Sequence, residues 1–260
     1  MKQYIVDAFT DKVFSGNPAA VCIMDSWLPD ELMKKIALEN NLSETAFAVK
    51  ESNGYRLRWF TSGGEIDLCG HATLACAYVI SNYYEKGAVS VSFNTLSGEL
   101  TVRQNGEFYE MEFPSFKLTH IPVTQNIIAA LGTVPSKVFL GRDMLCVFDD
   151  ENIVRNLKPD LEKIKQLNGL LLHITAKGND FDCVSRSFCP KCGVAEDPVC
   201  GSGHCHIIPY WSHELNKDKL TAYQASDRSG ILYCENKGDK VILGGKAALF
   251  SISDILCNNQ

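Results

Sequence analysis

Two cysteine–glycine steps, separated by about half of the chain, have residue types and neighbours that could do chemistry. Cys69-Gly70-His71 begins a segment that is apolar nearly all round, which predicts a helix in a protein core. Cys200-Gly201 precedes a second predicted helix. Because the first backbone N–H groups of a helix have no partner within it, each helix start suits a carboxylate. The pattern predicts a carboxylate clamp made of two helix N-termini, and two ordinary core helices are the equally weighted alternative.

A third candidate is the acid Glu44, which lies between the hydroxyl residues Ser43 and Thr45 and precedes the apolar run 46–49. A group that removes and returns one proton needs a pKa near the working pH, and apolar surroundings raise the pKa of a carboxylate. The pattern is therefore consistent with a general base. A solvated acid at the end of a helix is the simpler alternative.

The segment Cys189-Pro190-Lys191-Cys192 resembles half of a zinc knuckle. Structural zinc needs four ligands, usually supplied as two such pairs, and the chain has no second Cys-x-x-Cys. Residues that could complete a set lie in the segment that also begins the second predicted helix: Cys200, His204, Cys205 and His206. A zinc-containing module stays open as an alternative, but we expect no metal.

Composition narrows the class of protein. The chain has 260 residues with 25 Lys and Arg against 31 Asp and Glu, and without a basic run a nucleic-acid partner is not expected. No apolar stretch reaches membrane-spanning length and residues 1–9 do not resemble a signal peptide, so we expect a cytoplasmic protein. Its 11 cysteines are an odd number, which favours reduced thiols. Nucleotide-binding glycine loops and the His-Glu-x-x-His motif are absent, so no cofactor is expected.

The elements that would position these residues are mostly short strands. Alternating segments predict strands at 55–60, 89–93, 137–140, 144–148, 170–175, 181–188, 231–234 and 240–243. Asn105-Gly106 predicts the two left-handed positions of a tight hairpin turn within 100–113. Helices are expected over 29–39 and 160–167, and after His71 and Gly203. Without regular strand–helix alternation, the pattern indicates an α+β fold.

The two halves of the chain repeat a short pattern. Arg58-Trp59-Phe60 is followed by Asp67-Leu68-Cys69-Gly70, and Arg186-Ser187-Phe188 is followed by Asp197-Pro198-Val199-Cys200-Gly201. A duplicated architecture of two domains explains this repeat, whereas coincidence of Cys-Gly pairs is the alternative. The predicted junction lies near 114–122, which contains two prolines.

Taken together, these segments resemble the PhzF (phenazine biosynthesis-like) family. The stretches that carry the resemblance are Asp7-Ala8-Phe9-Thr10, Gly16-Asn17-Pro18-Ala19-Ala20-Val21, Ser43-Glu44-Thr45-Ala46-Phe47, Leu57-Arg58-Trp59-Phe60-Thr61, Cys69-Gly70-His71-Ala72-Thr73 and Glu196-Asp197-Pro198-Val199-Cys200-Gly201-Ser202. The resemblance implies the diaminopimelate-epimerase-like fold. That fold has two pseudo-symmetric domains, each a rolled, mostly antiparallel sheet around one central helix, with the active site between them. We expect domains at 1–117, completed by 247–260, and at 118–246.

The resemblance also implies cofactor-independent isomerase chemistry on a small carboxylate-bearing substrate, often in a homodimer. The family's catalytic glutamate falls on Glu44, which moves a proton by acid/base catalysis. Its supporting residues fall on His71, Asp197 and Ser202, which hold the substrate. The backbone of Gly70 and Gly201 and the side chain of Asn17 are further expected substrate contacts.

One departure from the family keeps a second mechanism open. The family usually has threonine where this chain has Cys200. Relatives that racemise or epimerise amino acids use two cysteines before glycines at helix starts, where Cys69 and Cys200 fall. A helix start favours the thiolate, so these two cysteines could form a two-base racemase. The intact Ser-Glu-Thr favours Glu44 instead, and a non-catalytic binder of small molecules is the remaining alternative.

Overall fold

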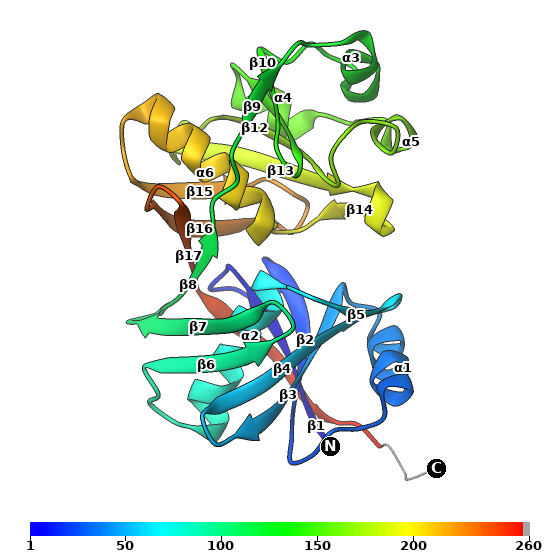
Figure 1. Cartoon of the computed structure of the whole chain (residues 1–260), viewed down its shortest axis with the longest axis vertical. Helices are drawn as coiled ribbons and strands as arrows, with labels where there is room; N and C mark the ends of the chain where they lie inside the picture. The colour runs from blue at the N-terminus through cyan, green and yellow to red at the C-terminus, as the bar shows by residue number, and fades with distance from the viewer. Residues whose placement is uncertain (257–260) are drawn as a thin grey trace. The chain divides into compact units, whose positions relative to one another are not determined.

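The computed structural model describes residues 1–256, and the chain divides into two compact units (Figure 1). Unit 1 contains Met1–Glu112 and the chain from Gly244 onward, and unit 2 contains Phe113–Leu243. The division thus falls after residue 112, whereas the sequence-based boundary lies after residue 117. Across the described residues, every helix is too short or too polar to span a bilayer.

Unit 1 is a sheet with one helix inside it and one outside. Its elements are β1 (Lys2–Ala8), β2 (Asn17–Met24), α1 (Asp30–Asn40), β3 (Glu44–Glu51), β4 (Gly54–Thr61), β5 (Gly64–Ile66), α2 (Gly70–Val79), the π-helical turn η1 (Ile80–Tyr84), β6 (Ser90–Thr95), β7 (Gly98–Asn105), β8 (Phe108–Pro114) and β18 (Ala247–Asp254). The sheet runs β18–β1–β2–β3–β4–β6–β7–β8. Only the pairs β2–β3 and β4–β6 are parallel, and each pair is joined by a connection that contains a helix.

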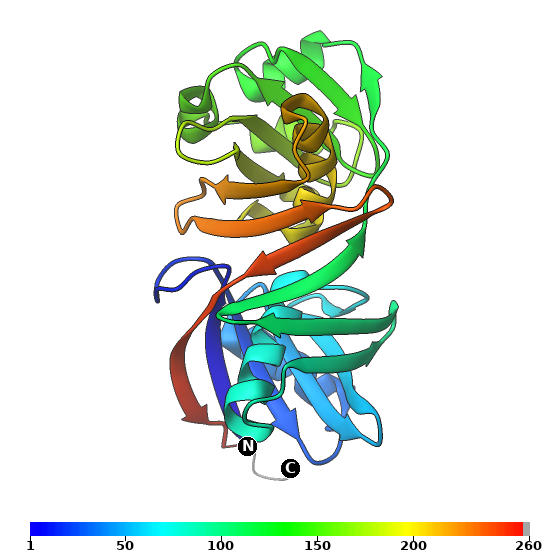
Figure 2. The same ribbon diagram turned by 90° about the vertical axis from the view of Figure 1, so that its left-hand side faces the viewer.

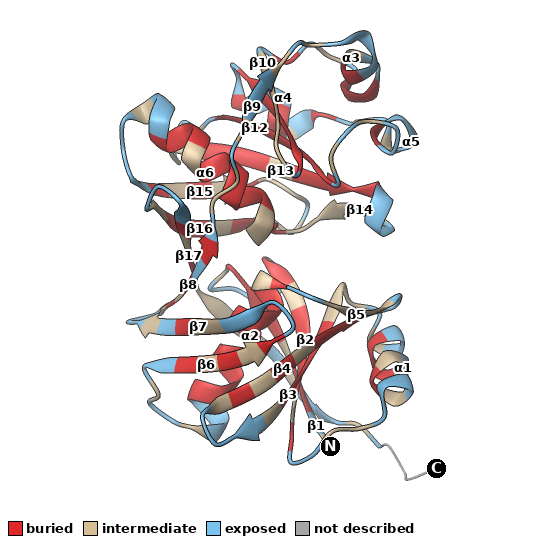
Figure 3. Cartoon of the chain, in the orientation of Figure 1, coloured by how far each residue is buried: buried red, intermediate tan, exposed pale blue. Residues whose placement is uncertain are grey.

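The helix α2 forms the centre of unit 1. It contacts β1, β2, β3, β7 and β18, so the sheet wraps around it, as Figures 1 and 2 show from two directions. Small side chains such as Ala72, Ala75 and Ala77 let the strands approach it closely, and nearly all of its residues are buried (Figure 3). The opposite face of the sheet is covered by α1, whose Met33 and Ile36 pack with β-strand side chains. The sequence prediction of a central core helix that begins near residue 70 therefore agrees with this unit.

Unit 2 has a similar plan with more helices on its outer face. Its elements are β9 (Thr119–Ile121), α3 (Gln125–Leu131), β10 (Lys137–Leu140), β11 (Met144–Phe148), α4 (Glu151–Asn156), α5 (Leu161–Ile164), β12 (Leu172–Lys177), β13 (Cys183–Cys189), the 3-10 turn η2 (Pro190–Cys192), β14 (Val194–Asp197), α6 (Gly201–Leu215), β15 (Lys219–Gln224), β16 (Gly230–Asn236) and β17 (Lys240–Gly245). The strands pair in the order β9–β10–β11–β12–β13–β15–β16, with β11–β12 and β13–β15 parallel. The long helix α6 contacts β15 and β16, and its side chains are mostly buried (Figure 3).

The repeated sequence pattern corresponds to a repeated contact. Arg58 of β4 donates two hydrogen bonds to the carboxylate of Glu65, and Arg186 of β13 donates two to the carboxylate of Glu196. In both units this strand precedes a short strand, the central helix and then a strand that pairs parallel to it. The α+β class and the architecture of two similar units are therefore as predicted.

The hairpin within 100–113 differs in detail from the prediction. Asn105 remains in β7, where it pairs with Phe108, and only Gly106 adopts a left-handed backbone, at φ 61°. The turn is therefore made by Gly106 and Glu107. A single left-handed first position is enough to reverse the chain when glycine occupies it, so Asn105 stays in the ladder.

Candidate functional site

Three of the predicted site residues meet at the start of α2. Glu44 is the first residue of β3, Cys69 is the N-cap of α2, and His71 lies in the first turn of the helix. Glu44 Oε2 lies 3.1 Å from His71 Nε2, and Cys69 Sγ lies 3.5 Å from His71 Nδ1. We call these three side chains the unit 1 centre.

The local sequence explains how the unit 1 centre is held. Cys69 has an extended backbone, with φ −145° and ψ 109°, so the chain enters the helix at a sharp angle and its sulfur lies beside the first turn. Its carbonyl oxygen accepts hydrogen bonds from both the N–H and the hydroxyl of Thr73. On the other side, β3 pairs with β2 so that Ala19 lies opposite Glu44. Two ordinary constraints, a capped helix and a strand register, therefore bring the three side chains together.

The electrostatics of the unit 1 centre favour a charged imidazole. Burial disfavours the imidazolium, but interactions with Cys69 and Glu44 outweigh it, so the pKa of His71 lies well above its usual value. Burial raises the pKa of the Cys69 thiol, and the nearby Glu44 carboxylate raises it further, against the opposing effect of His71. The centre is therefore best described as a Glu44–His71 ion pair beside a neutral thiol.

Access to the unit 1 centre differs among its members. The side chain of Glu44 is 17% exposed, while that of His71 is 8% exposed and Cys69 is buried. A molecule that approaches from solvent therefore reaches the carboxylate first. Gly70 begins α2, so its N–H has no partner within the helix. Asn17 is a buried residue at the start of β2, two residues before the neighbour of Glu44 and on the same face of the strand.

The other predicted residues lie together in unit 2. Cys200 is the N-cap of α6, and its Sγ accepts the N–H of Gly203 at 3.3 Å and lies 3.5 Å from Ser202 Oγ. The N–H of Cys200 donates to Gln224 Oε1, whose amide in turn donates to the carbonyl of Asp197. The segment 197–202 is thus a tightly bonded helix start, with Gly201 as the first residue of the helix.

The pKa values of the two N-cap thiols, Cys69 and Cys200, differ from the sequence-based expectation. A helix start was expected to favour the thiolate. In the structure, burial dominates at both positions and raises the pKa of Cys69 and of Cys200, the latter well above the usual value. The hydrogen bond from Gly203 to Cys200 acts in the opposite direction but does not reverse the effect. That the two sulfurs act together as the two bases of a racemase stays a prediction.

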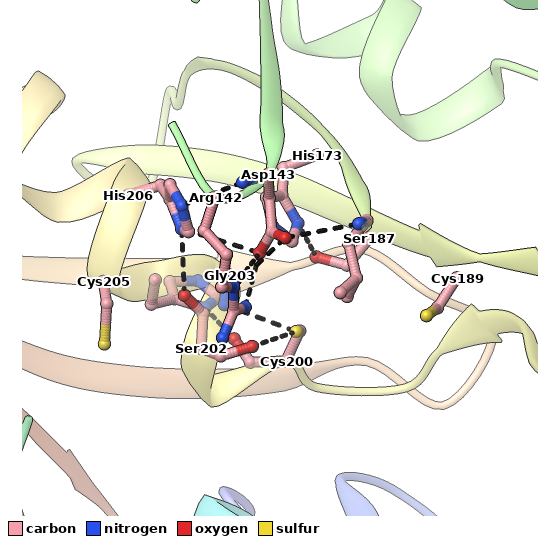
Figure 4. Close-up of polar contacts among 12 residues, drawn as sticks. Arg142, Asp143, His173, Ser187, Cys189, Cys200, Ser202, Gly203, Cys205 and His206 are labelled. Atoms are coloured by element: carbon pink, nitrogen blue, oxygen red, sulfur yellow. Dashed lines mark hydrogen bonds and ion pairs between the residues drawn. The ribbon is translucent and has the colours of Figure 1, made fainter. Parts of the chain in front are cut away.

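A polar cluster that sequence reasoning missed lies beside the start of α6 (Figure 4). Asp143 Oδ2 lies 3.2 Å from His173 Nε2, and His173 Nδ1 lies 2.9 Å from Ser187 Oγ. Asp143 also pairs with Arg142, and its backbone N–H donates to His206 Nε2. Burial alone would raise the pKa of Asp143, but hydrogen bonds from His173 and Arg142 hold it well below its usual range. Burial lowers the pKa of His206 to about 4, so this imidazole is neutral near pH 7.

The signal that could have revealed this cluster is a glycine. A Cβ atom at Gly203 would lie 2.7 Å from His173 Cε1, so only glycine leaves room for this imidazole. The second signal was His173, a histidine within the otherwise mostly apolar predicted strand 170–175.

The segment 189–192 corrects another expectation. Cys189 and Cys192 are joined as a disulfide, whereas the odd number of cysteines had favoured reduced thiols throughout. Neither sulfur is therefore a free thiolate for the zinc-knuckle alternative. Within residues 1–256, the two groups of three side chains that could hold a metal do not include them.

Comparison with known proteins identifies the family to which this chain belongs. The model of the phenazine biosynthesis-like proteins (PhzC-PhzF) matches residues 6–252. The chain belongs to this family. An uncharacterized isomerase of Pseudomonas aeruginosa is 46% identical, covering 94% of the chain and 95% of the relative. An uncharacterized isomerase of Halalkalibacterium halodurans is 42% identical, covering 97% of each chain.

Solved structures agree with the family assignment. A PhzF family protein of Enterococcus faecalis superposes with a TM-score of 0.95 at 50% identity, covering 96% of this chain and 97% of that one. A predicted epimerase of Pseudomonas aeruginosa has a TM-score of 0.77 at 17% identity, covering 99% of each chain, and shares the fold. The expected epimerase-like fold is therefore confirmed. Together, the PhzF family and its relatives named as isomerases support an isomerase role for this chain.

Proposed function

We propose that this PhzF family protein is an isomerase that moves one proton on a small carboxylate-bearing substrate, with Glu44 as the acid/base group and without a cofactor. One observation carries the proposal. The Glu44 carboxylate is partly exposed and lies 3.1 Å from a buried imidazole whose pKa is raised. A carboxylate that solvent can reach and a fixed charge partner behind it are what one-base proton transfer requires.

The proposed reaction has two proton transfers. The Glu44 carboxylate removes a proton from one carbon of the substrate, which leaves a carbanion stabilised as an enolate or extended conjugate, and the resulting carboxylic acid returns the proton to a second carbon. Between the two transfers Glu44 is neutral, and the adjacent His71 imidazolium is then the nearest positive charge for the anionic substrate. No atom is gained or lost, so the reaction is an isomerisation.

The roles proposed for the remaining residues follow from their positions. In unit 1, the free N–H of Gly70 at the start of α2 suits a substrate carboxylate, and Asn17 lies on the strand beside Glu44. In unit 2, Gly201 and Ser202 begin α6 and Asp197 precedes it, which supports a role in holding the other polar groups of a substrate. The expected cleft that joins the two sets stays a prediction, as does the homodimer.

The test of this proposal is exchange of substrate protons with deuterium from solvent. A panel of amino acids, hydroxyprolines and cyclic amino acids is incubated with the protein in D2O and read by mass spectrometry. We expect label on at least one carboxylate of the panel. If calorimetry shows binding of a panel member and the protein never labels it, the chain is a binder and the proposed isomerase role is wrong.

The two-thiol racemase keeps one supporting observation, because Cys69 and Cys200 are both N-caps of the central helices of their units. Against it, both thiols are buried and their pKa values are raised, whereas Glu44 is partly exposed. Cys200→Thr separates the two mechanisms. The Glu44 proposal expects this variant to keep its exchange activity, and a two-thiol mechanism expects that activity to be abolished.

A further inference from the structure

Within the described residues, two groups of three side chains bring metal-ligating atoms within 4.8 Å of one another. One is the unit 1 centre, formed by Glu44, Cys69 and His71. The other, in unit 2, is formed by Asp143, His173 and His206. Both contain ligand types that zinc prefers, so geometry and hydrogen bonding must decide between them.

The unit 1 centre is close to the geometry of a tetrahedral zinc site. With zinc–ligand lengths of about 2.0 Å to nitrogen or oxygen and about 2.3 Å to sulfur, neighbouring ligand atoms lie about 3.3 Å apart for N and O, and about 3.5 Å apart for N and S. In the structure, His71 Nε2 lies 3.1 Å from Glu44 Oε2 and 4.0 Å from Cys69 Sγ. Cys69 Sγ now lies nearer to Nδ1, at 3.5 Å, so the Cys69 side chain must turn toward Nε2 to complete one face of a tetrahedron.

The unit 1 centre is less enclosed than the unit 2 cluster. Glu44 is partly exposed, while the other two ligands are buried behind it. In addition, Glu44 Oε2 is buried and makes no hydrogen bond of good geometry, although it lies close to the imidazole. Three protein ligands, with the fourth position left to water, are the arrangement of catalytic rather than structural zinc sites.

The unit 2 cluster is unsuited to a metal for three reasons. Its three side chains are all 0% exposed, which leaves no open position. The Asp143 carboxylate already forms an ion pair with the Arg142 guanidinium, which would repel a second cation there. Finally, His206 Nε2 accepts the Asp143 N–H, so its Nδ1 bears the proton and donates to the carbonyl of Ser202. These contacts describe a hydrogen-bonded network (Figure 4).

We propose that the unit 1 centre binds one zinc ion reversibly through Glu44 Oε2, Cys69 Sγ and His71 Nε2, with water in the fourth position. Cysteine binds zinc as the thiolate and histidine binds it through an unprotonated ring nitrogen, so zinc takes the place of any proton on Sγ and Nε2 and that proton goes to solvent. Zinc bound to Glu44 also removes the carboxylate from proton transfer. Inhibition by zinc is the one part of this inference that rests on the proposed function.

The test uses Co²⁺ as a spectroscopic substitute for zinc, with the purified full chain. A thiolate–cobalt bond produces a charge-transfer absorption in the near ultraviolet, and a tetrahedral site adds intense visible bands. We expect both at one Co²⁺ per chain, with loss of the bands when Zn²⁺ is added. Calorimetry in two buffers of different ionisation enthalpy should find that metal binding releases protons, because cysteine binds the metal as the thiolate.

Matched variants assign the ligands. Cys69→Ser should remove the charge-transfer band, and Glu44→Gln or His71→Asn should weaken the apparent affinity by at least about tenfold, the size of change that outer-shell substitutions already reach at metal sites. Cys76→Ala is the control, because this buried cysteine lies two turns further along the same helix. His206→Asn controls for the unit 2 cluster. Both controls should keep the full spectrum.

Three results would overturn the inference. They are a charge-transfer band that persists in Cys69→Ser, a band that Cys76→Ala or His206→Asn removes, and no cobalt spectrum at millimolar metal. None of these readouts depends on catalysis, so zinc binding is decided even if deuterium exchange shows no isomerase activity. If exchange is found, stoichiometric Zn²⁺ should stop it and a chelator should restore it. Full exchange with zinc bound would refute the inhibitory part alone.

Discussion

The imidazole of His71 contacts a different side chain with each of its ring nitrogens, the thiol of Cys69 at Nδ1 and the carboxylate of Glu44 at Nε2. Because both partners are held by regular structure, the ring cannot leave one without disturbing the other. The carboxylate can thus gain and lose a proton against a fixed neighbour, which general acid/base catalysis needs.

The raised pKa of His71 predicts how the stability of the folded protein depends on pH. Its folded pKa is raised above the unfolded value of about 6.5, so the folded state holds the proton more tightly. The stabilisation is fully present below about pH 6.5 and is lost as the pH rises through the folded pKa. Urea unfolding from pH 5.5 to 9 should therefore show that wild type loses its advantage over His71→Gln as the pH rises. An advantage that grows with pH would contradict this assignment.

Sequence motifs predicted which residues meet in unit 1, but they did not predict the polar cluster of unit 2. Glu44, Cys69 and His71 lie within 28 residues of sequence, in segments whose patterns were informative. By contrast, Asp143, His173 and His206 come from a loop, a strand and a helix that are far apart in sequence. No local pattern reports which strands pair, so this cluster could not be predicted.

At the scale of elements, α6 is placed by the absence of a side chain at Gly203. A Cβ there would lie 2.7 Å and 2.8 Å from two ring atoms of His173. Gly203→Ala should destabilise the protein by about 1–3 kcal/mol, the usual cost of overpacking, although alanine is the better helix former. Thermal and urea unfolding measure this cost.

The control for that prediction is in the same turn of the helix. A Cβ at Gly201 would meet only a Leu243 methyl group at 3.6 Å, an ordinary contact, so Gly201→Ala should change the unfolding free energy by much less. His173→Ala should cost less stability in the Gly203→Ala background than in the wild-type background, because one of its effects there is to remove the clash. If Gly203→Ala is as stable as wild type, the close approach does not constrain α6.

Arg186, the unit 2 counterpart of Arg58, should also contribute to the stability of the folded protein. Arg186 is largely buried, pairs with Glu196 and donates to the carbonyls of Val154 and Leu157 at the end of α4. Arg186→Ala leaves these acceptors unpaired and should cost about 3 kcal/mol. The exposed pair of Lys165 and Glu162 is the comparison, since Lys165→Ala should cost less than about 1 kcal/mol. Equal losses in urea unfolding would contradict the importance of the repeated contact.

Long and strongly patterned elements were predicted better than short ones. The helices α2 and α6 were recognised because glycine-containing starts precede apolar runs. The helices α3 and α4 were missed, since they span only seven and six residues and depend on side-chain caps from Thr124 and Asp150. In helices this short, the cap and the packing contribute more than the pattern does.

At the scale of the whole molecule, the two units repeat one plan, but among the described residues only unit 1 has a partly exposed carboxylate paired with an imidazole beside the start of its central helix; the His213–Glu214 pair of unit 2 lies at the other end of α6. In unit 1 the central helix begins beside Glu44. In unit 2 the corresponding position is a buried, hydrogen-bonded network beside Cys200 and Ser202. This asymmetry is the reason that we propose one acid/base residue rather than two equivalent ones.

The oligomeric state of the chain can be tested in solution. The resemblance to the PhzF family led us to expect a homodimer. Sedimentation equilibrium or light scattering at micromolar concentration should find twice the mass of one chain. A single-chain mass across the whole concentration range would show that this expectation is wrong.

The proposed role of Glu44 as the proton carrier is tested by deuterium exchange in Glu44→Gln, on whichever carboxylate the wild-type protein labels. Glu51→Gln is the matched control, because Glu51 is an exposed residue at the other end of the same strand. We predict that Glu44→Gln binds that carboxylate almost as tightly as wild type but exchanges its proton at least about 100-fold more slowly. The control should exchange at the wild-type rate. Exchange at the wild-type rate in Glu44→Gln would contradict the account.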